Sequence, residues 1–425
     1  MKKLLLLVLL FFYYQNSNSQ SSAHKIIDSF ITREYPVLDK LYKELHQNPE
    51  LSLQEEKTAQ TMAAELKNAG FEVIENIGGF GLAGIFKNGK GPTVLIRADM
   101  DALPLEEKTG LPYASNAKGV NATGHDVSIM HACGHDIHMT VFIGTAKSLI
   151  QAKNEWKGTL VMVAQPAEEN GLGADMMFKD GLYDKIPTPD YAIALHDNSF
   201  LPAGKIGYRE GPFMASVDMM DISVFGVGGH GAAPHTTIDP VVLSSHMVLA
   251  FQNIVSRELN PIDPAVITVG SIHGGTVHNI IPDQVSLQLT LRSYSEEVRN
   301  HTIKSIERIS KNLALAAGLP EDKIPVISIR ETQTPATVND AGLTKRLVPV
   351  FRKIIGENNV EEMPPYMVGE DFSRFGMQKK KVPIFMFWLG AADPEKVKKA
   401  EEAGEQLPSL HSPFFAPLPE PTIKT

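Results

Sequence analysis

Three short apolar runs, each followed directly by polar residues, constrain the fold of this chain more than any other feature. The runs are "TVLI" (93–96), "TLVMVA" (159–164) and "YAIAL" (191–195), and helix-like stretches separate them. A continuous apolar run bounded by turn residues is typical of a strand buried on both faces, which favours a mainly parallel sheet flanked by helices. In such sheets, ligands bind beyond the carboxyl ends of the strands. We therefore expect a site where the residues that follow these runs meet.

The residues that follow the three runs are acids and a histidine. Asp99 and Asp101 come after the first run, Glu168 and Glu169 come after the second, and His196 comes directly after the third. Adjacent glutamates most often lie on a solvated face, and one histidine at a strand end indicates little by itself. Three strand ends that all carry carboxylate or imidazole groups indicate one shared crevice.

Residues 128–139, "SIMHACGHDIHM", contain three histidines and the only cysteine of the chain. One residue separates Cys133 from His135, so a tight turn could aim both side chains at one point. Thiolate and imidazole groups bind zinc and related ions, and a catalytic site also needs a carboxylate ligand and a base that does not bind the metal. Glu168 and Glu169 could divide these tasks. An incidental Cys-x-His pair, or a redox or nucleophilic cysteine, is the alternative interpretation.

Residues 215–333 show a different pattern, in which apolar and polar residues alternate, most strictly in "VSLQLTLRSY" (285–294). Alternation predicts a sheet with one wet face and with helices on the other face. We expect one helix to begin at Asp239, and another to begin at a capping box formed by Ser293 and Glu296. The order strand–helix–strand–strand–helix–strand predicts a two-layer α+β domain of the ferredoxin-like type.

The chain returns to its earlier pattern after residue 333, with an expected helix over 341–355 and a buried strand over 383–389. A chain of 425 residues is too long for one hydrophobic core. We therefore predict a larger α/β domain made of residues 25–214 and 334–425, into which residues 215–333 are inserted as a second domain.

Residues 1–20 differ in composition from the rest of the chain. "MKKLLLLVLLFFYY" places two lysines before an apolar run that is too short to span a bilayer comfortably, and small polar residues follow. This pattern is typical of a signal peptide, so we expect export, periplasmic or secreted, with no stable membrane span after signal removal. An uncleaved anchor is the alternative. A lone cysteine excludes an intramolecular disulfide, and a net charge of −9 without a basic cluster argues against nucleic acid as a partner.

Nine short motifs occur in order between residues 40 and 416 and resemble those of one family. They are "LHQNPELSLQEE", "RADMDALPL", "MHACGHDIHM", "QPAEENGLGA", "GVGGHGAAPH", "NIIPD", "LRS", "GEDFSRF" and "LHSPFF". They are similar to motifs of the metal-dependent amidohydrolases that include hippurate hydrolase, N-acyl-amino-acid amidohydrolase and the plant auxin-conjugate (IAA-amino acid) hydrolases, relatives of carboxypeptidase G and aminoacylase. The resemblance implies a zinc-peptidase-like catalytic domain, with residues 215–333 as a lid and dimerisation domain.

The resemblance also implies roles for individual residues. Glu168 would be the general base, and His230 would reach a partner's active site to stabilise the oxyanion. Asn279 and Arg292 would hold the carboxylate end of the substrate, and Asp101 would support the ligands. Two divalent ions per subunit, zinc or else manganese, cobalt or nickel, would be bound by Cys133, His135, Glu169, His196 and His411.

These roles imply hydrolysis of the amide bond of N-acyl amino acids by metal-activated water, in a homodimer formed through the inserted domain. An exported metallo-dipeptidase or carboxypeptidase is an alternative. A non-catalytic metal- or ligand-binding homologue is a weaker alternative, because the chain keeps Glu168. Ile137, Asn170 and Asp197 depart from the residues usual in the family, and the preferred acyl group and amino acid are therefore not predicted.

Overall fold

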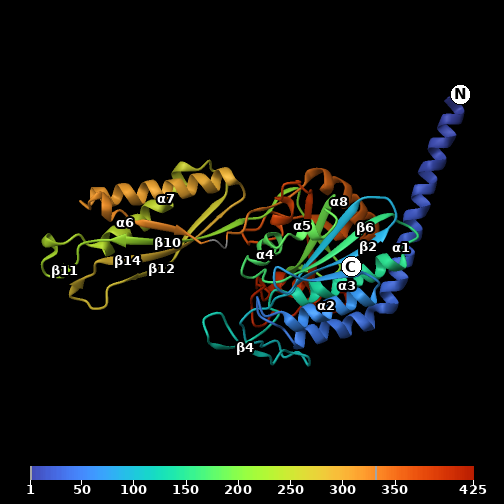
Figure 1. The fold of residues 1–425 in the computed structure, drawn as a ribbon, viewed down its shortest axis with the longest axis horizontal. Helices are drawn as coiled ribbons and strands as arrows, with labels where there is room; N and C mark the ends of the chain where they lie inside the picture. The colour runs from blue at the N-terminus through green and yellow to red at the C-terminus, as the bar shows by residue number, and fades with distance from the viewer. Residues whose placement is uncertain (1, 331–332) are drawn as a thin grey trace. The chain divides into compact units, whose positions relative to one another are not determined.

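The structure is a computed structural model that describes residues 2–330 and 333–425, with side chains from residue 22 onward. The chain divides into two compact units (Figure 1). Unit 1 consists of Met1–Gly211, Asn339–Pro364 and Arg374–Thr425, and unit 2 consists of Pro212–Val338 and Pro365–Ser373. Their assignment as a catalytic domain and a lid and dimerisation domain stays a prediction.

Unit 1 is built on one large sheet, which in the described part of the chain has the strand order β1-β2-β6-β3-β7-β18-β8-β17. The neighbours β6, β3, β7 and β18 run parallel to one another, and antiparallel pairs lie outside this block. The expected mainly parallel sheet is confirmed. The strands are β1 (Glu72–Ile77), β2 (Gly81–Asn88), β3 (Thr93–Asp99), β6 (Gly158–Gln165), β7 (Tyr191–Pro202), β8 (Ile206–Tyr208), β17 (Val360–Glu362) and β18 (Ile384–Ala392).

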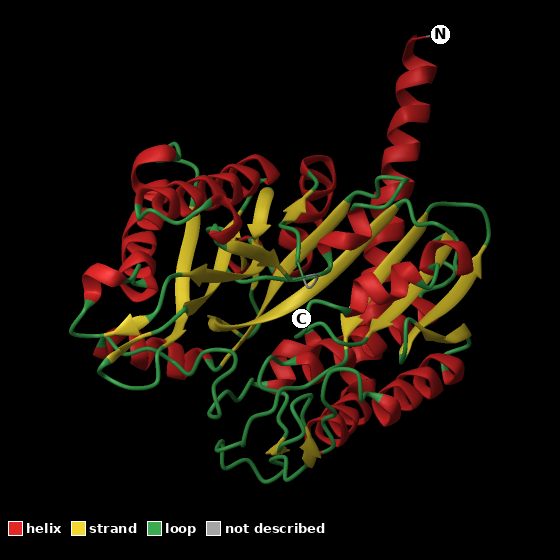
Figure 2. Ribbon diagram, turned by 60° about the vertical axis from the view of Figure 1, so that its left-hand side comes forward, coloured by secondary structure: helices red, strands yellow, loops and turns green. Residues whose placement is uncertain are grey.

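The helices of unit 1 flank this sheet (Figure 2), and apolar side chains fill the space between them. Leu38 and Tyr42 of α1, Leu66 of α2 and Phe142 of α3 belong to one core cluster with Leu160 and Met162 of β6. The helices are α1 (Lys2–Gln47), α2 (Glu56–Asn68), α3 (His135–Gln151), α4 (Gly173–Lys179), α5 (Leu182–Lys185), α8 (Ala341–Ile355), α9 (Ser373–Gly376), α10 (Pro394–Ala403) and α11 (Pro419–Lys424). Short strands β4 (Lys118–Val120) and β5 (Asp126–Ser128) form a small hairpin.

Unit 2 contains an antiparallel sheet of strand order β12-β14-β10-β15 in its described residues, with α6 and α7 on one face (Figure 1). This is the expected ferredoxin-like order of strands and helices, and Val285, Leu287, Leu289 and Leu291 are buried beneath the helices as the alternation predicts. The elements are β9 (Gly211–Met214), β10 (Ser216–Phe225), β11 (Gly229–His230), α6 (Pro240–Asn253), β12 (Ala265–Gly274), β13 (Ile280–Ile281), β14 (Gln284–Ser293), α7 (Glu296–Ala316), β15 (Val326–Ile329) and β16 (Thr337–Asn339).

Some predicted boundaries are wrong. Ser293 does not cap α7, because it is the last residue of β14 and pairs with Ser216 and Ala265. The cap is Ser295, whose hydroxyl accepts a hydrogen bond from Val298 N. The strand expected from the third apolar run is longer than that run, since β7 continues past residue 195 to Pro202 and pairs with β18. Asp239 does cap α6, as expected.

The N-terminal segment forms the beginning of α1, but the side chains of residues 1–21 lie outside those that the structure describes. The signal peptide expected at residues 1–20 therefore stays a prediction. Among the helices of the described residues, none combines the length and the apolar character that a membrane crossing requires.

Candidate metal centre

The five predicted metal ligands come from four segments that meet at one edge of the unit 1 sheet. Cys133 and His135 flank Gly134 at the start of α3, and Glu169 follows β6. His196 is the sixth residue of β7, which begins at Tyr191. His411 comes from a C-terminal turn, and its backbone N–H donates to Ala132 O at 2.8 Å, which fixes this distant segment beside Cys133.

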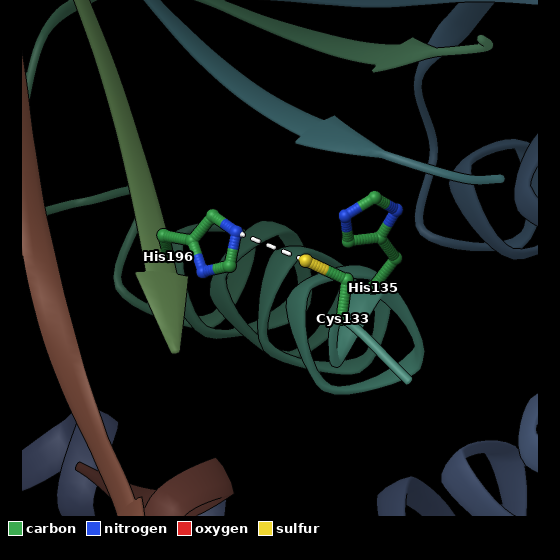
Figure 3. Close-up of side chains that lie close together, drawn as sticks. All are labelled: Cys133, His135 and His196. Atoms are coloured by element: carbon green, nitrogen blue, oxygen red, sulfur yellow. Dashed lines mark hydrogen bonds between the residues drawn. The ribbon is translucent and has the colours of Figure 1, made fainter. Parts of the chain in front are cut away.

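The donor atoms of these residues form two groups that share the sulfur of Cys133. One group is Cys133, His135 and His196, and the other is Cys133, Glu169 and His411; in each group all three donor atoms lie within 4.8 Å of one another. Cys133 Sγ is 3.5 Å from His196 Nε2 and 3.3 Å from His411 Nε2. Figure 3 shows the sulfur between the rings of His135 and His196. Two overlapping triads with one shared thiol suit a pair of cations.

Buried donor atoms without partners test whether this site fits metal ions. In the part of the chain that the structure describes, His135 Nε2 and Glu169 Oε1 are buried and accept or donate no hydrogen bond, and they lie 3.8 Å apart. Leaving such atoms unpaired is costly unless something binds them. Burial also raises the pKa of the Cys133 thiol well above its usual range, and the charge of Glu169 adds to this effect. A divalent cation would satisfy both atoms and stabilise the thiolate, so the donor set fits metal ions.

The orientation of the two buried ligand histidines is set by their other ring nitrogens. His135 Nδ1 donates to Asp101 O at 2.7 Å, and His196 Nδ1 donates to Asp197 O at 2.8 Å. Each Nε2 is then the nitrogen with a free lone pair, and in both rings this atom faces the cluster. Hydrogen bonds of this kind fix the tautomer and the ring plane of metal-binding histidines.

Asp101 connects the ligand helix to the two glutamates. Its carboxylate oxygens accept hydrogen bonds from Glu168 N at 3.1 Å and Glu169 N at 3.0 Å, and Ser52 Oγ donates to it at 2.6 Å. Oδ1 also lies 3.4 Å from His135 Nδ1. The supporting role expected for Asp101 stays a prediction. A carboxylate oxygen of Glu168 lies within 4.8 Å of donor atoms of His135 and Glu169, so Glu168 borders the cluster.

A second layer of buried charge lies behind the cluster. Asp99 Oδ2 accepts a hydrogen bond from Arg97 Nη1 at 2.6 Å, and Asp99 Oδ1 accepts one from His138 Nδ1 at 2.6 Å. His138 Nε2 in turn accepts a hydrogen bond from Asp197 N at 2.9 Å. Burial raises the pKa of Asp99, but the adjacent His135 and His138 rings and the Arg97 guanidinium lower it well below its usual range. These residues hold β3, α3 and β7 together where the ligands project.

The sequence contained a weak signal for part of this layer. Asp99 stands two residues before Asp101 after a buried strand, so both side chains emerge at the same edge of the sheet. His138 lies three residues after His135, and thus on the same side of α3, which is a reason to expect it behind a ligand. Nothing in the local sequence indicates that Asp197 is their partner, because the contact joins segments 59 residues apart.

Of the three departures from the family pattern, Asp197 alone has polar contacts at the cluster. Its side chain is fully buried, and Oδ1 lies 3.1 Å from His196 Nδ1. Ile137 is buried in the core cluster of unit 1, whereas Asn170 is exposed on the segment after Glu169. The effect of these residues on specificity stays open to experiment.

The substrate residues predicted in unit 2 fall into two places. His230 and Asn279 are exposed neighbours, since Gly231 N donates to Asn279 O at 2.8 Å and His230 pairs with Ile280. Arg292 is partly buried near the opposite end of β14, where it pairs with Val217. The structure therefore brings His230 and Asn279 together and separates both from Arg292 within one chain.

Comparison with known proteins agrees with this geometry. A model of peptidase family M20/M25/M40 matches residues 95–408. The chain is 38% identical to hippurate hydrolase of Campylobacter jejuni over 82% of its own length and 87% of that protein. It is 37% identical to thermostable carboxypeptidase 2 of Saccharolobus solfataricus over 83% of its own length and 86% of that protein.

A solved structure of similar architecture comes from Bacillus subtilis and is described as a dinuclear metal binding peptidase from the M20 family. It aligns with a TM-score of 0.73 and 28% identity, and covers 93% of this chain and 96% of that one. The family predicted from the nine motifs is confirmed. The chain belongs to peptidase family M20/M25/M40 and is a metal-dependent hydrolase of amide bonds.

Proposed function

We propose that this hydrolase cleaves the amide bond of N-acyl amino acids at a pair of divalent cations. One observation carries the proposal: two donor triads share the sulfur of Cys133, directly beside a glutamate that belongs to neither. The cations would be held by Cys133, His135, Glu169, His196 and His411. The hippurate hydrolase among the relatives supports an N-acyl amino acid as the substrate, since hippurate is one.

The residues of the cluster would divide the work between binding and proton transfer. When bound, divalent cations polarise the scissile carbonyl and lower the pKa of the attacking water. Glu168 accepts the proton of that water and then delivers it to the leaving amine. Asp101 orients Glu168 through the backbone, by accepting the N–H of Glu168 and that of the next residue. His230 would donate a hydrogen bond to the developing oxyanion.

Zinc is the proposed metal. A thiolate with three imidazoles is a soft to borderline donor set, which favours zinc over the harder cations magnesium and calcium. The carboxylate of Glu169 and the open positions of a catalytic site also suit manganese, cobalt or nickel. Metal analysis of protein purified without added metal, followed by reconstitution with each ion, distinguishes these ions.

We also propose that the enzyme works as a homodimer through unit 2. From Val217, opposite Arg292, the chain runs thirteen positions to His230, along β10 and then into the separate two-stranded β11–β13 sheet, which at the rise of an extended strand is a length of roughly 40 Å. A small substrate cannot touch both ends in one copy. The ten-residue edge strand β12, with exposed Ile272, offers a surface on which a second copy could pair. Export through the N-terminal signal peptide stays part of the proposal and is supported by the sequence pattern of residues 1–20.

The function is tested with a panel of hippurate, N-acetyl amino acids and dipeptides, and with the variant Glu168→Gln. Removing the base is expected to lower kcat by about 10² to 10⁴-fold, while the metal content stays at the wild-type level. Glu169→Gln is the matched control, because it changes the neighbouring carboxylate and should reduce the metal content itself.

Each outcome of this test has a defined meaning. Turnover of N-acyl amino acids by the wild type and a loss confined to kcat in Glu168→Gln support the proposal. Preferred cleavage of dipeptides would support the carboxypeptidase or dipeptidase alternative. The similarity to a thermostable carboxypeptidase is a second argument for that alternative. A Glu168→Gln enzyme with wild-type kcat would contradict the assigned base.

A further inference from the structure

A buried carboxylate outside the metal cluster binds two strained backbone positions at once. Glu55, the residue before α2, is fully buried. Its Oε1 accepts hydrogen bonds from Leu53 N at 3.0 Å and from Ala167 N at 2.8 Å. Leu53 has φ 67° and Ala167 has φ 50°, the left-handed region that residues other than glycine rarely adopt. One oxygen atom therefore holds two unfavourable conformations that lie 114 positions apart in the chain, and both belong to unit 1.

Ala167 is the turning point between strand β6 and the two functional glutamates. The strand ends at Gln165, and the chain must reverse direction within two residues to present Glu168 and Glu169 toward the cluster. The carbonyl of Ala167 accepts Leu172 N at 3.2 Å and Gly173 N at 3.0 Å, which closes the turn from its other side. A residue that prefers a right-handed or extended backbone stays left-handed here only if its surroundings hold it.

Three consecutive backbone N–H groups in this turn are bound by two buried carboxylates. Ala167 N donates to Glu55, while Glu168 N and Glu169 N donate to the two oxygens of Asp101. Asp101 also contacts His135, so it ties the turn to the ligand helix. Glu55 contacts no predicted ligand; its polar contacts in the described structure are backbone groups on either side of the cluster. The two acids therefore fix the same turn from different elements.

We propose that Glu55 is a positioning residue for catalysis, which sets the direction of the Glu168 side chain by holding Ala167 in its left-handed conformation. The inference rests on the proposed function, in which Glu168 transfers the proton. Proton transfer requires that the base lie within hydrogen-bonding reach of the attacking water, and an error of about 1 Å in such a position can cost about 100-fold in rate. Loss of the Glu55 acceptor would therefore lower kcat without removing a ligand.

The charge of Glu55 is not needed for this role. Burial, with a smaller effect from the charge of Asp101, raises the pKa of Glu55 to about 7, so the protonated and ionised forms are both present near neutral pH. Both donors use Oε1, and Oε2 is buried without a hydrogen-bond partner in the described structure. A glutamine can present the same carbonyl-type acceptor to Leu53 and Ala167, whereas a methionine of similar length cannot.

The test compares Glu55→Met with Glu55→Gln in the metal-loaded enzyme. We expect Glu55→Met to lower kcat by about 10- to 100-fold with KM and metal content close to the wild type, and Glu55→Gln to recover most of the loss. Hydrogen exchange of the peptide that covers residues 165–172 supplies a readout that needs no activity. Its amides should exchange about tenfold faster or more in Glu55→Met.

Glu50→Met is the matched control. Glu50 accepts hydrogen bonds from Lys57 N at 3.2 Å and Thr58 N at 2.8 Å, so it too is a carboxylate that binds two amides at the start of α2. Among the described residues, no hydrogen bond or ion pair joins the Glu50 side chain to residues 165–172. A variant that merely weakens this region would behave like Glu50→Met, with a lower melting temperature, an unchanged kcat and unchanged exchange at 165–172.

The possible outcomes separate the inference from the function on which it rests. Equal effects of Glu55→Met and Glu50→Met on kcat and on exchange would overturn the positioning role. An inactive wild type would contradict the proposed function, and hydrogen exchange would still decide whether Glu55 holds the turn. If Glu55→Met does not fold, Glu55→Asp replaces it, since a shorter side chain withdraws the acceptor and should lower kcat; wild-type kcat in Glu55→Asp would then overturn the proposal.

Discussion

His46, in the last turn of α1, lies between two buried carboxylates. Its Nδ1 is 2.7 Å from Asp136 Oδ2 and its Nε2 is 3.1 Å from Glu107 Oε1. Burial lowers the pKa of His46, but the hydrogen bonds to the two acids raise it more, to about 9. The ring therefore carries a positive charge at neutral pH. It joins α1 to the helix that begins with His135 and to the loop that follows β3.

We predict that His46→Gln destabilises the protein, most strongly at neutral and acidic pH. The folded-state pKa of about 9 lies above the ordinary value of 6.5, so the contribution is complete below about pH 6.5 and is lost as the pH rises through 9. The shift corresponds to about 3 kcal/mol. Chemical denaturation of wild type and variant at a series of pH values measures the difference in free energy of unfolding. His235→Gln, at an exposed position, is the control. A difference that grows with increasing pH would contradict the prediction.

Single residues also show which parts of the site can be predicted from the sequence. The five predicted ligands lie close together. Cys133, His135 and Glu169 converge because they border a helix start or follow a parallel strand at the same sheet edge. The turn that carries His411 is joined to them by a long-range backbone hydrogen bond that no local pattern reports. Their roles stay predictions. His46 lies at the end of a helix, as the nearby Pro49 indicates, but its burial between two acids could not be predicted. Its partners Glu107 and Asp136 are 61 and 90 residues away, and no local pattern reports contacts of that range.

The start of α3 is the element on which the ligand geometry depends most. Gly134 precedes the helix with φ 74°, a conformation that glycine adopts easily because it has no Cβ atom. Cys133 and His135 therefore lie on either side of a sharp turn. A Cβ atom there would lie 2.2 Å from Asp197 Oδ2, far inside van der Waals contact. Gly110 has almost the same φ of 73°, yet a Cβ atom at Gly110 would meet nothing within 4 Å. The two glycines therefore separate backbone strain from steric collision.

We predict that Gly134→Ala is markedly more destabilising than Gly110→Ala. A left-handed alanine costs about 1 to 2 kcal/mol, which is the whole effect expected for Gly110→Ala. Gly134→Ala adds the displacement of the buried Asp197 carboxylate, for which overpacking costs of about 1 to 3 kcal/mol are typical, so a total of about 2 to 5 kcal/mol is expected. Chemical denaturation of the metal-free proteins measures both values. Equal losses would mean that Asp197 can move aside without cost.

Elements were predicted well where burial alone decides their type, and less well where tertiary pairing sets their ends. The continuous apolar runs identify β3, β6, β7 and β18 because such runs can only be buried on both faces. The capping box at Ser293 failed, since β14 is paired on both sides, with β10 and β12, through that residue. Hydrogen bonds of the sheet therefore extend the strand past a local signal for a helix start.

At the scale of the whole molecule, the sequence predicts the type of sheet in each of the two units, but it does not predict how copies of the chain combine. Alternation in unit 2 and continuous burial in unit 1 follow from which faces of each sheet are covered, so both sheets could be anticipated. The separation between Arg292 and His230 could not be anticipated, because it requires the register of β10 with β14 and of β11 with β13 in a second, separate sheet. That distance leads to the proposal that two copies build each site.

A subunit-mixing experiment tests this proposal. Glu168→Gln lacks the base and His230→Asn lacks the oxyanion donor, so each homodimer is expected to be about 10² to 10³-fold less active or worse. If the partner supplies His230, a mixed dimer contains one site with an intact Glu168 and a partner's intact His230, and co-expression of the two variants restores activity. If His230 acts within its own chain, every site in the mixture keeps one defect and no activity returns.

Glu168→Gln mixed with Cys133→Ser is the control, because both defects then lie in the metal cluster of their own chain and recovery is impossible in either arrangement. Sedimentation velocity must show dimers in both mixtures, and a wild type that sediments as a monomer at assay concentration would contradict the shared site directly.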